Sequence, residues 1–165
     1  MIKLLVLDVD GVLTDGKIIY TESGHEIKNF NVRDGLGIKM AQKANITVAI
    51  ISGRESRVTE LRAKELKIEH VFTGIDNKLD CLDKLCEKLG IVLDKETAFI
   101  GDDINDIAIL KRCAFSGTVA DAPYYIKKEV NFVSNFKGGK GAVREFIEAI
   151  LMRNEQWEDI YKSYL

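Results

Sequence analysis

The fold of this chain is decided by the stretch Val6-Leu7-Asp8-Val9-Asp10-Gly11-Val12-Leu13-Thr14-Asp15. An apolar run over residues 2–7, with Lys3 as its only polar member, stops there at two carboxylates. Such a run, bounded by a turn signal, is typical of a strand that is buried on both faces. Side chains two apart on a strand point the same way, so Asp8 and Asp10 can converge at its carboxyl end. Two acids at one edge repel each other unless a cation lies between them, and their hard oxygen atoms suit Mg²⁺.

Composition is that of one globular domain. The 165 residues can bury a core of their own, and contents of 46% hydrophobic and 30% charged residues are ordinary for such a domain. A net charge of −2 argues against nucleic acid or an acidic membrane as a partner, and the apolar runs are too short to span a bilayer. Three cysteines without metal-type spacing, and no signal peptide, favour a reducing compartment. We therefore expect a single cytoplasmic domain over residues 1–165.

Strand-like and helix-like segments alternate along the chain. We expect strands at residues 2–7, 46–51, 70–72, 98–100, 115–119 and 132–133, and a hairpin formed by residues 17–20 and 25–30 around a Ser-Gly turn. We expect helices from a cap at Asp34 to about residue 44, after Ser52 with Val58, Leu61 and Leu66 inward, over 77–89 with Gly90 closing it, over 104–111, and over 142–152 with an amphipathic tail to Leu165. This alternation predicts an α/β fold, a doubly wound and mostly parallel sheet with helices on both faces.

Polar side chains follow three of the predicted strands. Asp8 and Asp10 follow the first strand, Ser52 follows the second, and Asp102 follows the strand at residues 98–100. Ligands of doubly wound sheets bind beyond the carboxyl ends of the strands, so we expect these groups to share one edge. Lys78 lies in the first turn of its helix, where a cation opposes the helix dipole unless an anion is bound nearby.

Each group also has a plain structural interpretation. The D-x-D-G sequence is compatible with a solvated acidic turn, Ser52 with Glu55 forms a candidate helix capping box, and Lys78 is compatible with a solvated side chain. The segment 101–106, GDDIND, carries more carboxylates than a cap needs, which favours metal ligation.

Together these groups predict phosphoryl transfer. A phosphate ester is repelled by carboxylates unless Mg²⁺ and Lys78 neutralise the charge. One carboxylate can then attack phosphorus to form an aspartyl-phosphate. A second acid, two residues on, can protonate the leaving alcohol and later activate water.

The ordered set Asp8-Val9-Asp10-Gly11, Ser52, Lys78 and Gly101-Asp102-Asp103 with Asp106 resembles the four motifs of the haloacid dehalogenase superfamily of phosphatases. The resemblance covers nearly the whole chain. It implies that Asp8 is the nucleophile, that Asp10 is the acid/base, and that Ser52 and Lys78 hold the phosphate. The Mg²⁺ ligands that it implies are Asp8, the Asp10 backbone carbonyl and Asp102, with Asp103 or Asp106 in support.

Residues 30–38, 51–54 and 138–145 resemble a capless branch, the 3-deoxy-D-manno-octulosonate 8-phosphate phosphatases. Only residues 12–51 separate Gly11 from Ser52, and the hairpin and first helix use them up, so no cap domain fits there. The resemblance implies a sugar phosphate substrate, lipopolysaccharide biosynthesis, and a homotetramer in which a neighbour's hairpin and C-terminal tail close the site. The substrate-binding residues that it implies are Asn31, Val32, Arg33, Asp34, Gly35, Lys39, Arg54, Arg62 and Lys78.

Several alternatives stay open. The sister family acting on 2-keto-3-deoxynononate 9-phosphate tends to carry glutamate where Arg54 stands, so Arg54 favours the octulosonate, with the nononate or another sugar phosphate as the alternative. Lys39 stands where arginine is frequent, which keeps the charge but loses bidentate geometry. A phospho-receiver module would need its acceptor aspartate where this chain has Ser52, and a non-catalytic binding protein is separated only by a turnover assay. The loop at residues 138–141 is compatible with a simple opening of the last helix.

Overall fold

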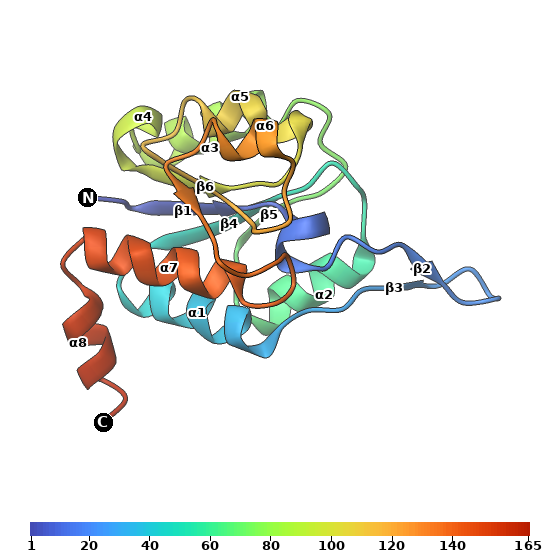
Figure 1. Ribbon diagram of the computed structural model, residues 1–165, viewed down its shortest axis with the longest axis horizontal. Helices are drawn as coiled ribbons and strands as arrows, with labels where there is room; N and C mark the ends of the chain where they lie inside the picture. Colours follow the sequence, from blue (N-terminus) through green and yellow to red (C-terminus); the bar gives the residue numbers. More distant parts are fainter.

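Six strands form one sheet at the centre of the computed structural model, which describes residues 1–165 (Figure 1). They are β1 (Leu4–Leu7), β4 (Thr47–Ile51), β5 (His70–Phe72), β6 (Thr97–Ile100), β7 (Phe115–Thr118) and β8 (Phe132–Val133). The strand order is β5-β4-β1-β6-β7-β8, and every pairing is parallel. The predicted doubly wound sheet is therefore confirmed. Its strand β1 lies in the interior of the sheet, between β4 and β6.

Helices cover both faces of this sheet, as Figure 1 shows. One face carries α1 (Val32–Lys43), α2 (Arg57–Glu65) and α7 (Ala142–Arg153), and the other carries α3 (Lys78–Leu89), α4 (Leu93–Glu96), α5 (Ile107–Leu110) and α6 (Tyr124–Lys127). The predicted tail forms a separate short helix, α8 (Trp157–Lys162), which extends from the body of the molecule. No helix combines the length and the apolar character that crossing a membrane requires.

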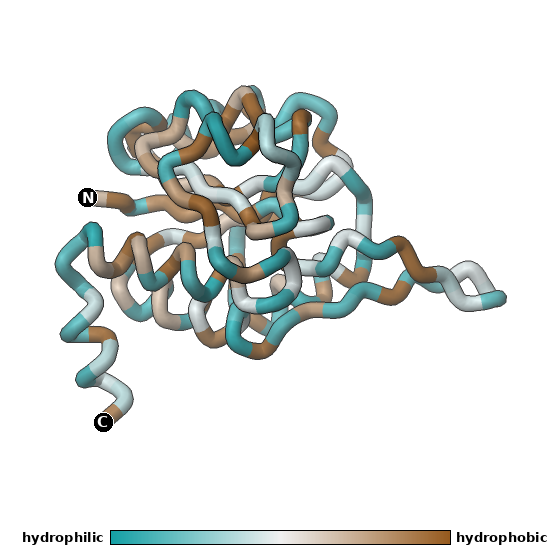
Figure 2. Tube along the Cα trace, viewed as in Figure 1, coloured by the Kyte–Doolittle hydropathy of each residue, from teal (hydrophilic) through white to brown (hydrophobic).

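The core lies between the sheet and these helices. All four residues of β1 are fully buried, and the largest buried side chains include Phe99 of β6 and Phe146 of α7. Figure 2 shows hydrophobic residues along the strands and on the inner sides of the helices, with hydrophilic residues outside. Burial of apolar surface stabilises a fold by about 25 cal/mol per Å² of apolar area removed from water. This core therefore holds the strands, and the residues at their ends, in fixed positions.

The helix starts correct two sequence interpretations. Helix α1 begins after Asn31, whose side chain accepts from the Arg33 amide, so Asp34 is not its cap. Helix α2 begins after Ser56, whose hydroxyl accepts from the Thr59 amide at 3.2 Å, so Ser52 does not form a capping box with Glu55. Ser52 instead stays in the loop after β4, buried and free of helical structure.

Other boundaries differ only in detail. Leu61, expected inside, is 55% exposed, whereas Leu66 is buried as expected. The helix expected over 104–111 begins with one tighter turn, Ile104–Asp106, before α5. The four-residue helices α4 and α6 were not predicted, because one turn is too short to show a helical period. Gly90 closes α3 in the left-handed conformation, as predicted.

The predicted hairpin is present and projects from the body of the molecule (Figure 1). Its strands, β2 (Ile19–Tyr20) and β3 (Glu26–Ile27), pair antiparallel outside the main sheet. Several of its apolar side chains face outward, including Ile18 at 60% and Tyr20 at 61% exposure. A two-stranded hairpin is marginal in water by itself, so its contacts with the rest of the chain are important for its position.

Candidate active site

Three neighbouring strands deliver polar groups to one edge of the sheet. Asp8 follows β1, Ser52 follows β4 and Asp102 follows β6, while Lys78 opens α3 beside them. Together they line a cavity of about 280 Å³. The full lining is Asp8, Asp10, Gly11, Gly16, Ser52, Gly53, Arg54, Lys78, Asp102, Asp103 and Asn105. The predicted convergence at the carboxyl ends of the strands is therefore present, without a single apolar side chain in the lining.

Lys78 forms a buried ion pair with two carboxylates. Its Nζ lies 2.8 Å from Asp8 Oδ1 and 2.7 Å from Asp106 Oδ1, and it is only 4% exposed. Burial alone would lower the pKa of Lys78, but the two carboxylates outweigh it and raise the pKa. Lys78 is thus a charged group inside the site, and its interpretation as a solvated lysine is wrong.

Asp106 holds two parts of the site through hydrogen bonds, the Lys78 amine and the loop after β6. It is fully buried, and its Oδ2 accepts from the backbone amides of Asp102 at 3.0 Å and Asp103 at 3.4 Å. Asp103 is exposed, and its Oδ1 accepts from the Ile104 amide at the start of the following turn. Asp106 therefore fixes both Lys78 and the loop that carries Asp102.

The carboxylates are crowded beyond what one lysine can neutralise. Oxygen atoms of Asp8, Asp102 and Asp106 all lie within 4.8 Å of one another. Burial and the negative charges of Asp8 and Asp106 raise the pKa of Asp102 to about 8. Burial and Asp106 raise the pKa of Asp8 to about 6, against the opposing effect of Lys78. An oxygen-rich site with surplus negative charge fits a hard divalent cation such as Mg²⁺.

Gly11 allows this crowding. Its φ is +89°, and a Cβ built there would lie 2.1 Å from Asp102 Oδ2. A side chain at this position would therefore push the Asp102 carboxylate away from the loop of Asp8 and Asp10. The glycine is required both for the left-handed backbone and for the close approach.

Ser52 presents a hydroxyl to the cavity. The residue is 2% exposed, and its backbone is fixed by hydrogen bonds to Phe72 and Ile75 on either side. Its hydroxyl has no hydrogen-bond partner within the protein, so it is available to a bound anion.

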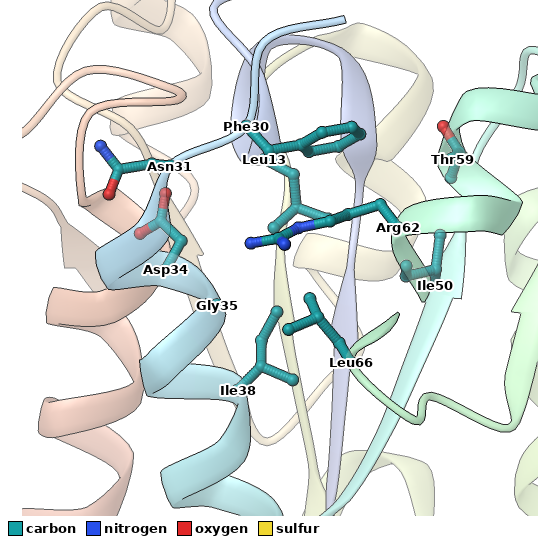
Figure 3. A pocket seen from close by; sticks show the side chains of 10 residues that line it. All are labelled: Leu13, Phe30, Asn31, Asp34, Gly35, Ile38, Ile50, Thr59, Arg62 and Leu66. Atoms are coloured by element: carbon teal, nitrogen blue, oxygen red, sulfur yellow. The ribbon is translucent and has the colours of Figure 1, made fainter. Parts of the chain in front are cut away.

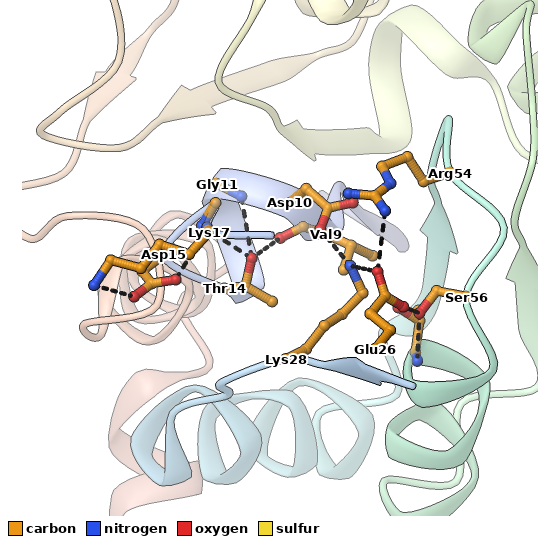
Figure 4. A network of polar contacts seen from close by, with 12 residues as sticks. Val9, Asp10, Gly11, Thr14, Asp15, Lys17, Glu26, Lys28, Arg54 and Ser56 are labelled. Atoms are coloured by element: carbon orange, nitrogen blue, oxygen red, sulfur yellow. Dashed lines mark hydrogen bonds and ion pairs between the residues drawn. The ribbon is translucent and has the colours of Figure 1, made fainter. Parts of the chain in front are cut away.

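Asp10 and Arg54 both contact the hairpin, which sequence reasoning did not foresee. The Asp10 carboxylate accepts from Lys28 Nζ, and Arg54 donates to Glu26 at 3.2 Å (Figure 4). Arg54 also donates to the Tyr20 hydroxyl at 3.3 Å. Glu26 and Lys28 stand two apart around β3, and such spacing places two side chains on one face of a strand. That alternation was the only available signal, and nothing in the sequence indicated which surface the face would meet.

The predicted substrate-binding residues divide into three groups. Arg54 and Lys78 line the cavity at the sheet edge. Asn31, Asp34, Gly35 and Arg62 line a separate cavity of about 10 Å³ between α1 and α2, below Phe30 (Figure 3). Val32, Arg33 and Lys39 lie exposed on α1 and line neither cavity.

Asp34 has a structural partner that its position in α1 did not reveal. Its Oδ1 accepts from the Arg144 amide at 2.9 Å, at the start of α7, whose own first residues provide no side-chain cap. Burial raises the pKa of Asp34 to about 6, although the backbone amides of Arg144, Gly141 and Val143 favour its charged form. Asp34 therefore caps the neighbouring helix.

The loop at residues 138–141 contacts the segment that follows Asp8 and Asp10. The Gly139 amide donates to the Val12 carbonyl at 2.9 Å, and a Cβ on Gly138 would lie 1.8 Å from the Gly11 carbonyl oxygen. Asn31 donates to the Gly139 carbonyl at 3.3 Å. The loop thus opens α7 and also packs directly behind residues 11–15.

Fold, site and sequence agree on the class of this protein, the haloacid dehalogenase-like hydrolases, whose family profile matches residues 74–147. Curated relatives narrow this class. The 3-deoxy-D-manno-octulosonate 8-phosphate phosphatase KdsC of Haemophilus influenzae is 46% identical over 151 residues, which cover 91% of this chain and 83% of the relative. The enzyme of the same name from Salmonella typhi is 44% identical over 151 residues, covering 92% and 80%. The chain belongs to the family of 3-deoxy-D-manno-octulosonate 8-phosphate phosphatases.

A solved structure supports the same assignment. The 3-deoxy-D-manno-octulosonate 8-phosphate phosphatase from Moraxella catarrhalis, solved in complex with magnesium ion, phosphate ion and KDO, has a TM-score of 0.96 and 40% identity. The match covers 99% of this chain and 94% of that one. The predicted resemblance to the haloacid dehalogenase superfamily and to its octulosonate branch is confirmed.

Proposed function

We propose that this protein is a Mg²⁺-dependent phosphatase that hydrolyses 3-deoxy-D-manno-octulosonate 8-phosphate to the free sugar acid and phosphate. The observation that carries the proposal is the single polar cavity in which Asp8, Ser52, Lys78 and Asp102 converge. The relatives supply the substrate, because two curated enzymes of the family carry its name at 44–46% identity. Lipopolysaccharide biosynthesis is the process that this activity would serve.

Asp8 is the proposed nucleophile. Its carboxylate lies in the cavity, held at 2.8 Å by Lys78, and can attack phosphorus to form an aspartyl-phosphate. Lys78 and the free hydroxyl of Ser52 bind the phosphate oxygens. Lys78 brings a positive charge to a buried place, where electrostatic stabilisation of the transferring group is strongest.

Asp10 is the proposed acid/base. It gives a proton to the departing alcohol oxygen as the ester bond breaks, and later takes a proton from the water that hydrolyses the aspartyl-phosphate. Asp8, the Asp10 backbone carbonyl and Asp102 would hold Mg²⁺, with Asp106 and Asp103 in support. Bound Mg²⁺ supplies positive charge that reduces the repulsion between phosphate and carboxylates.

Arg54 is the proposed contact for the carboxylate of the sugar acid. It lines the catalytic cavity and is partly exposed, and its planar fork can pair a carboxylate with two hydrogen bonds. The family resemblance also proposes Asn31 to Gly35, Lys39 and Arg62 as substrate contacts, although they lie outside the catalytic cavity of this chain. The second candidate function is hydrolysis of 2-keto-3-deoxynononate 9-phosphate, and Arg54 argues against it.

A phosphate-release assay over a panel of sugar acid phosphates with Mg²⁺ tests this proposal. The octulosonate 8-phosphate should give the highest kcat/KM, and removal of divalent cations with EDTA should abolish release. A higher kcat/KM for the nononate 9-phosphate would assign the second function, and binding without release of phosphate would contradict catalysis altogether.

We further propose a cytoplasmic homotetramer of single-domain subunits, in which the hairpin and the C-terminal tail close neighbouring sites. The exposed apolar side chains of the hairpin and the 92% exposed Leu165 at the chain end support contacts between subunits. Three free cysteines support a reducing compartment. Light scattering should give four times the mass of one chain, and a fully active monomer would contradict the assembly.

A further inference from the structure

Lys28 is an unusual lysine, because it lies just after a projecting hairpin strand yet has a side chain only 2% exposed. Its amine contacts two carboxylates, those of Asp10 and Glu26 (Figure 4). Lysine is almost never fully buried unless it is paired, so these two contacts explain its position. No other side chain of the protein donates a hydrogen bond to Asp10, which leaves Lys28 as the one group that orients this carboxylate.

Glu26 holds Lys28 in place. Its carboxylate accepts from Lys28 at 3.2 Å, from Arg54 at 3.2 Å and from the Ser56 hydroxyl at 2.8 Å. Ser56 also caps α2, so the network is anchored to a helix start. Charge-assisted hydrogen bonds of this kind are stronger than neutral ones and impose geometry. The network therefore runs from α2 through the hairpin to the catalytic loop.

We infer that Lys28 is a positioning residue, which binds Oδ1 of Asp10 and so orients its carboxyl group to give a proton to the leaving oxygen once it is protonated, with Glu26 holding Lys28. The inference rests on the proposed function, because it assumes that Asp10 is the acid. The hairpin then has a second task besides covering the site: it sets the direction of proton transfer. A misplacement of about 1 Å can cost on the order of 10²-fold in rate, so orientation by a single buried contact has a measurable effect.

Leaving groups separate this role from a general structural one. A sugar alkoxide is strongly basic and needs a proton as the ester bond breaks, whereas p-nitrophenolate departs without one. Loss of proton delivery therefore lowers kcat/KM for an alkyl phosphate much more than for p-nitrophenyl phosphate. A change that merely loosens the fold or weakens phosphate binding lowers both by the same factor.

The test is Lys28→Met, which keeps the length of the side chain and removes its charge. We expect kcat/KM for a sugar phosphate that lacks a carboxylate to fall about 10- to 100-fold, and that for p-nitrophenyl phosphate by less than about threefold. Because neither substrate carries a carboxylate, the proposed contact of Arg54 does not contribute to this difference. Lys28→Arg should restore most of the loss. Glu26→Gln should show the same dependence on the leaving group at a smaller size. Lys17→Met, on the same hairpin with a side chain 73% exposed, is the matched control and should leave both values unchanged.

Two further outcomes decide the inference. In the background of Asp10→Asn, Lys28→Met should cost less than about twofold more, because residues that act through each other are not additive. Equal losses on alkyl and aryl substrates, or full additivity with Asp10→Asn, would overturn the inference and leave the proposed function standing. Should Lys28→Met fail to fold by circular dichroism, the same leaving-group comparison on Glu26→Gln decides it, with Lys28→Arg as the variant that keeps the charge and most of the activity. Wild-type protein that releases no phosphate from any ester would overturn the proposed function and this inference together.

Discussion

The sheet edge and the hairpin place functional groups in opposite ways. Asp8 and Asp102 follow strands that are fully buried and paired on both sides, so their backbones are fixed by the core. Glu26 lies in a two-stranded sheet outside the core and Lys28 directly follows it, and the side chains of both residues are fixed by ion pairs. The proposed nucleophile and metal ligands therefore lie on a rigid scaffold, whereas the residues proposed to orient the proton donor lie on an element with little stability of its own.

Asp8→Asn tests the rigid edge most directly and has the largest expected effect. The amide is a poor nucleophile, and its carbonyl is a weaker ligand for a divalent cation than a carboxylate, so kcat should fall by at least about 10³-fold. Phosphate release with Mg²⁺ measures it. Retention of a tenth of the wild-type rate would place the nucleophile elsewhere on this edge.

Asp34→Asn tests the rigid side through stability. Burial raises the pKa of Asp34 in the folded protein to about 6, from the ordinary value of 3.8 for an aspartate. Its stabilising contribution is therefore present below about pH 4 and is lost as pH rises through about 6, which amounts to roughly 3 kcal/mol for a shift of this size. The free energy of unfolding in urea, measured for both proteins, should change in favour of Asp34→Asn by this order between pH 4 and 7. A difference that stays constant with pH would contradict the raised pKa.

Arg54→Ala tests the hairpin side through substrate choice. A charge-assisted pair with a carboxylate is worth roughly 1.5–3 kcal/mol, so kcat/KM for the sugar acid phosphate should fall tenfold to a hundredfold. A small aryl phosphate lacks that carboxylate and should be hydrolysed within about threefold of the wild-type rate. Equal losses on both substrates would assign Arg54 to the phosphate or to the fold.

Gly139→Ala, compared with Gly90→Ala, tests how the loop of residues 138–141 supports the rigid edge. Both glycines have left-handed φ values, +68° and +65°, so both substitutions cost about 1–2 kcal/mol in backbone strain. At Gly139 the new Cβ would also lie 2.7 Å from the Asp15 amide nitrogen, whereas nothing lies within 4 Å at Gly90. Thermal unfolding should show about 1–3 kcal/mol more destabilisation for Gly139→Ala, because backbone is in the way. Only this variant should also lower kcat, and identical behaviour of the two would show that the loop does not support the site.

The sequence predicted the rigid edge well and the hairpin side poorly, for a physical reason. Asp8 and Ser52 directly follow an apolar run, and Asp102 follows one after Gly101, so the end of each strand and its polar group can be predicted together. The ion pair of Lys28 with Asp10 depends on how the hairpin folds back, which no spacing in the chain encodes. The role of Asp34 was missed for the same reason, because an acid in the first turn of α1 gives no sign that the start of α7 lies beside it. Ser56 directly precedes α2, and serine is a residue type that favours helix N-caps, so the sequence did contain a signal for this cap.

The central position of β1 in the sheet has a consequence for how the enzyme folds during its synthesis. Asp8, the proposed nucleophile, is synthesised well before β6, yet β1 pairs with β6 through Leu4–Leu7 and Thr97–Ile100, and the Gly139 amide donates to Val12 in the segment after Asp8. At translation speeds of about 5–20 residues per second, the nascent chain exposes its most apolar strand for on the order of ten seconds before both partners have emerged. Such non-local parallel pairing also folds slowly. A ribosome-bound chain cut short before residue 97 should therefore carry every atom of Asp8 and Asp10 and no phosphatase activity, and its exposed apolar surface would make it prone to aggregation.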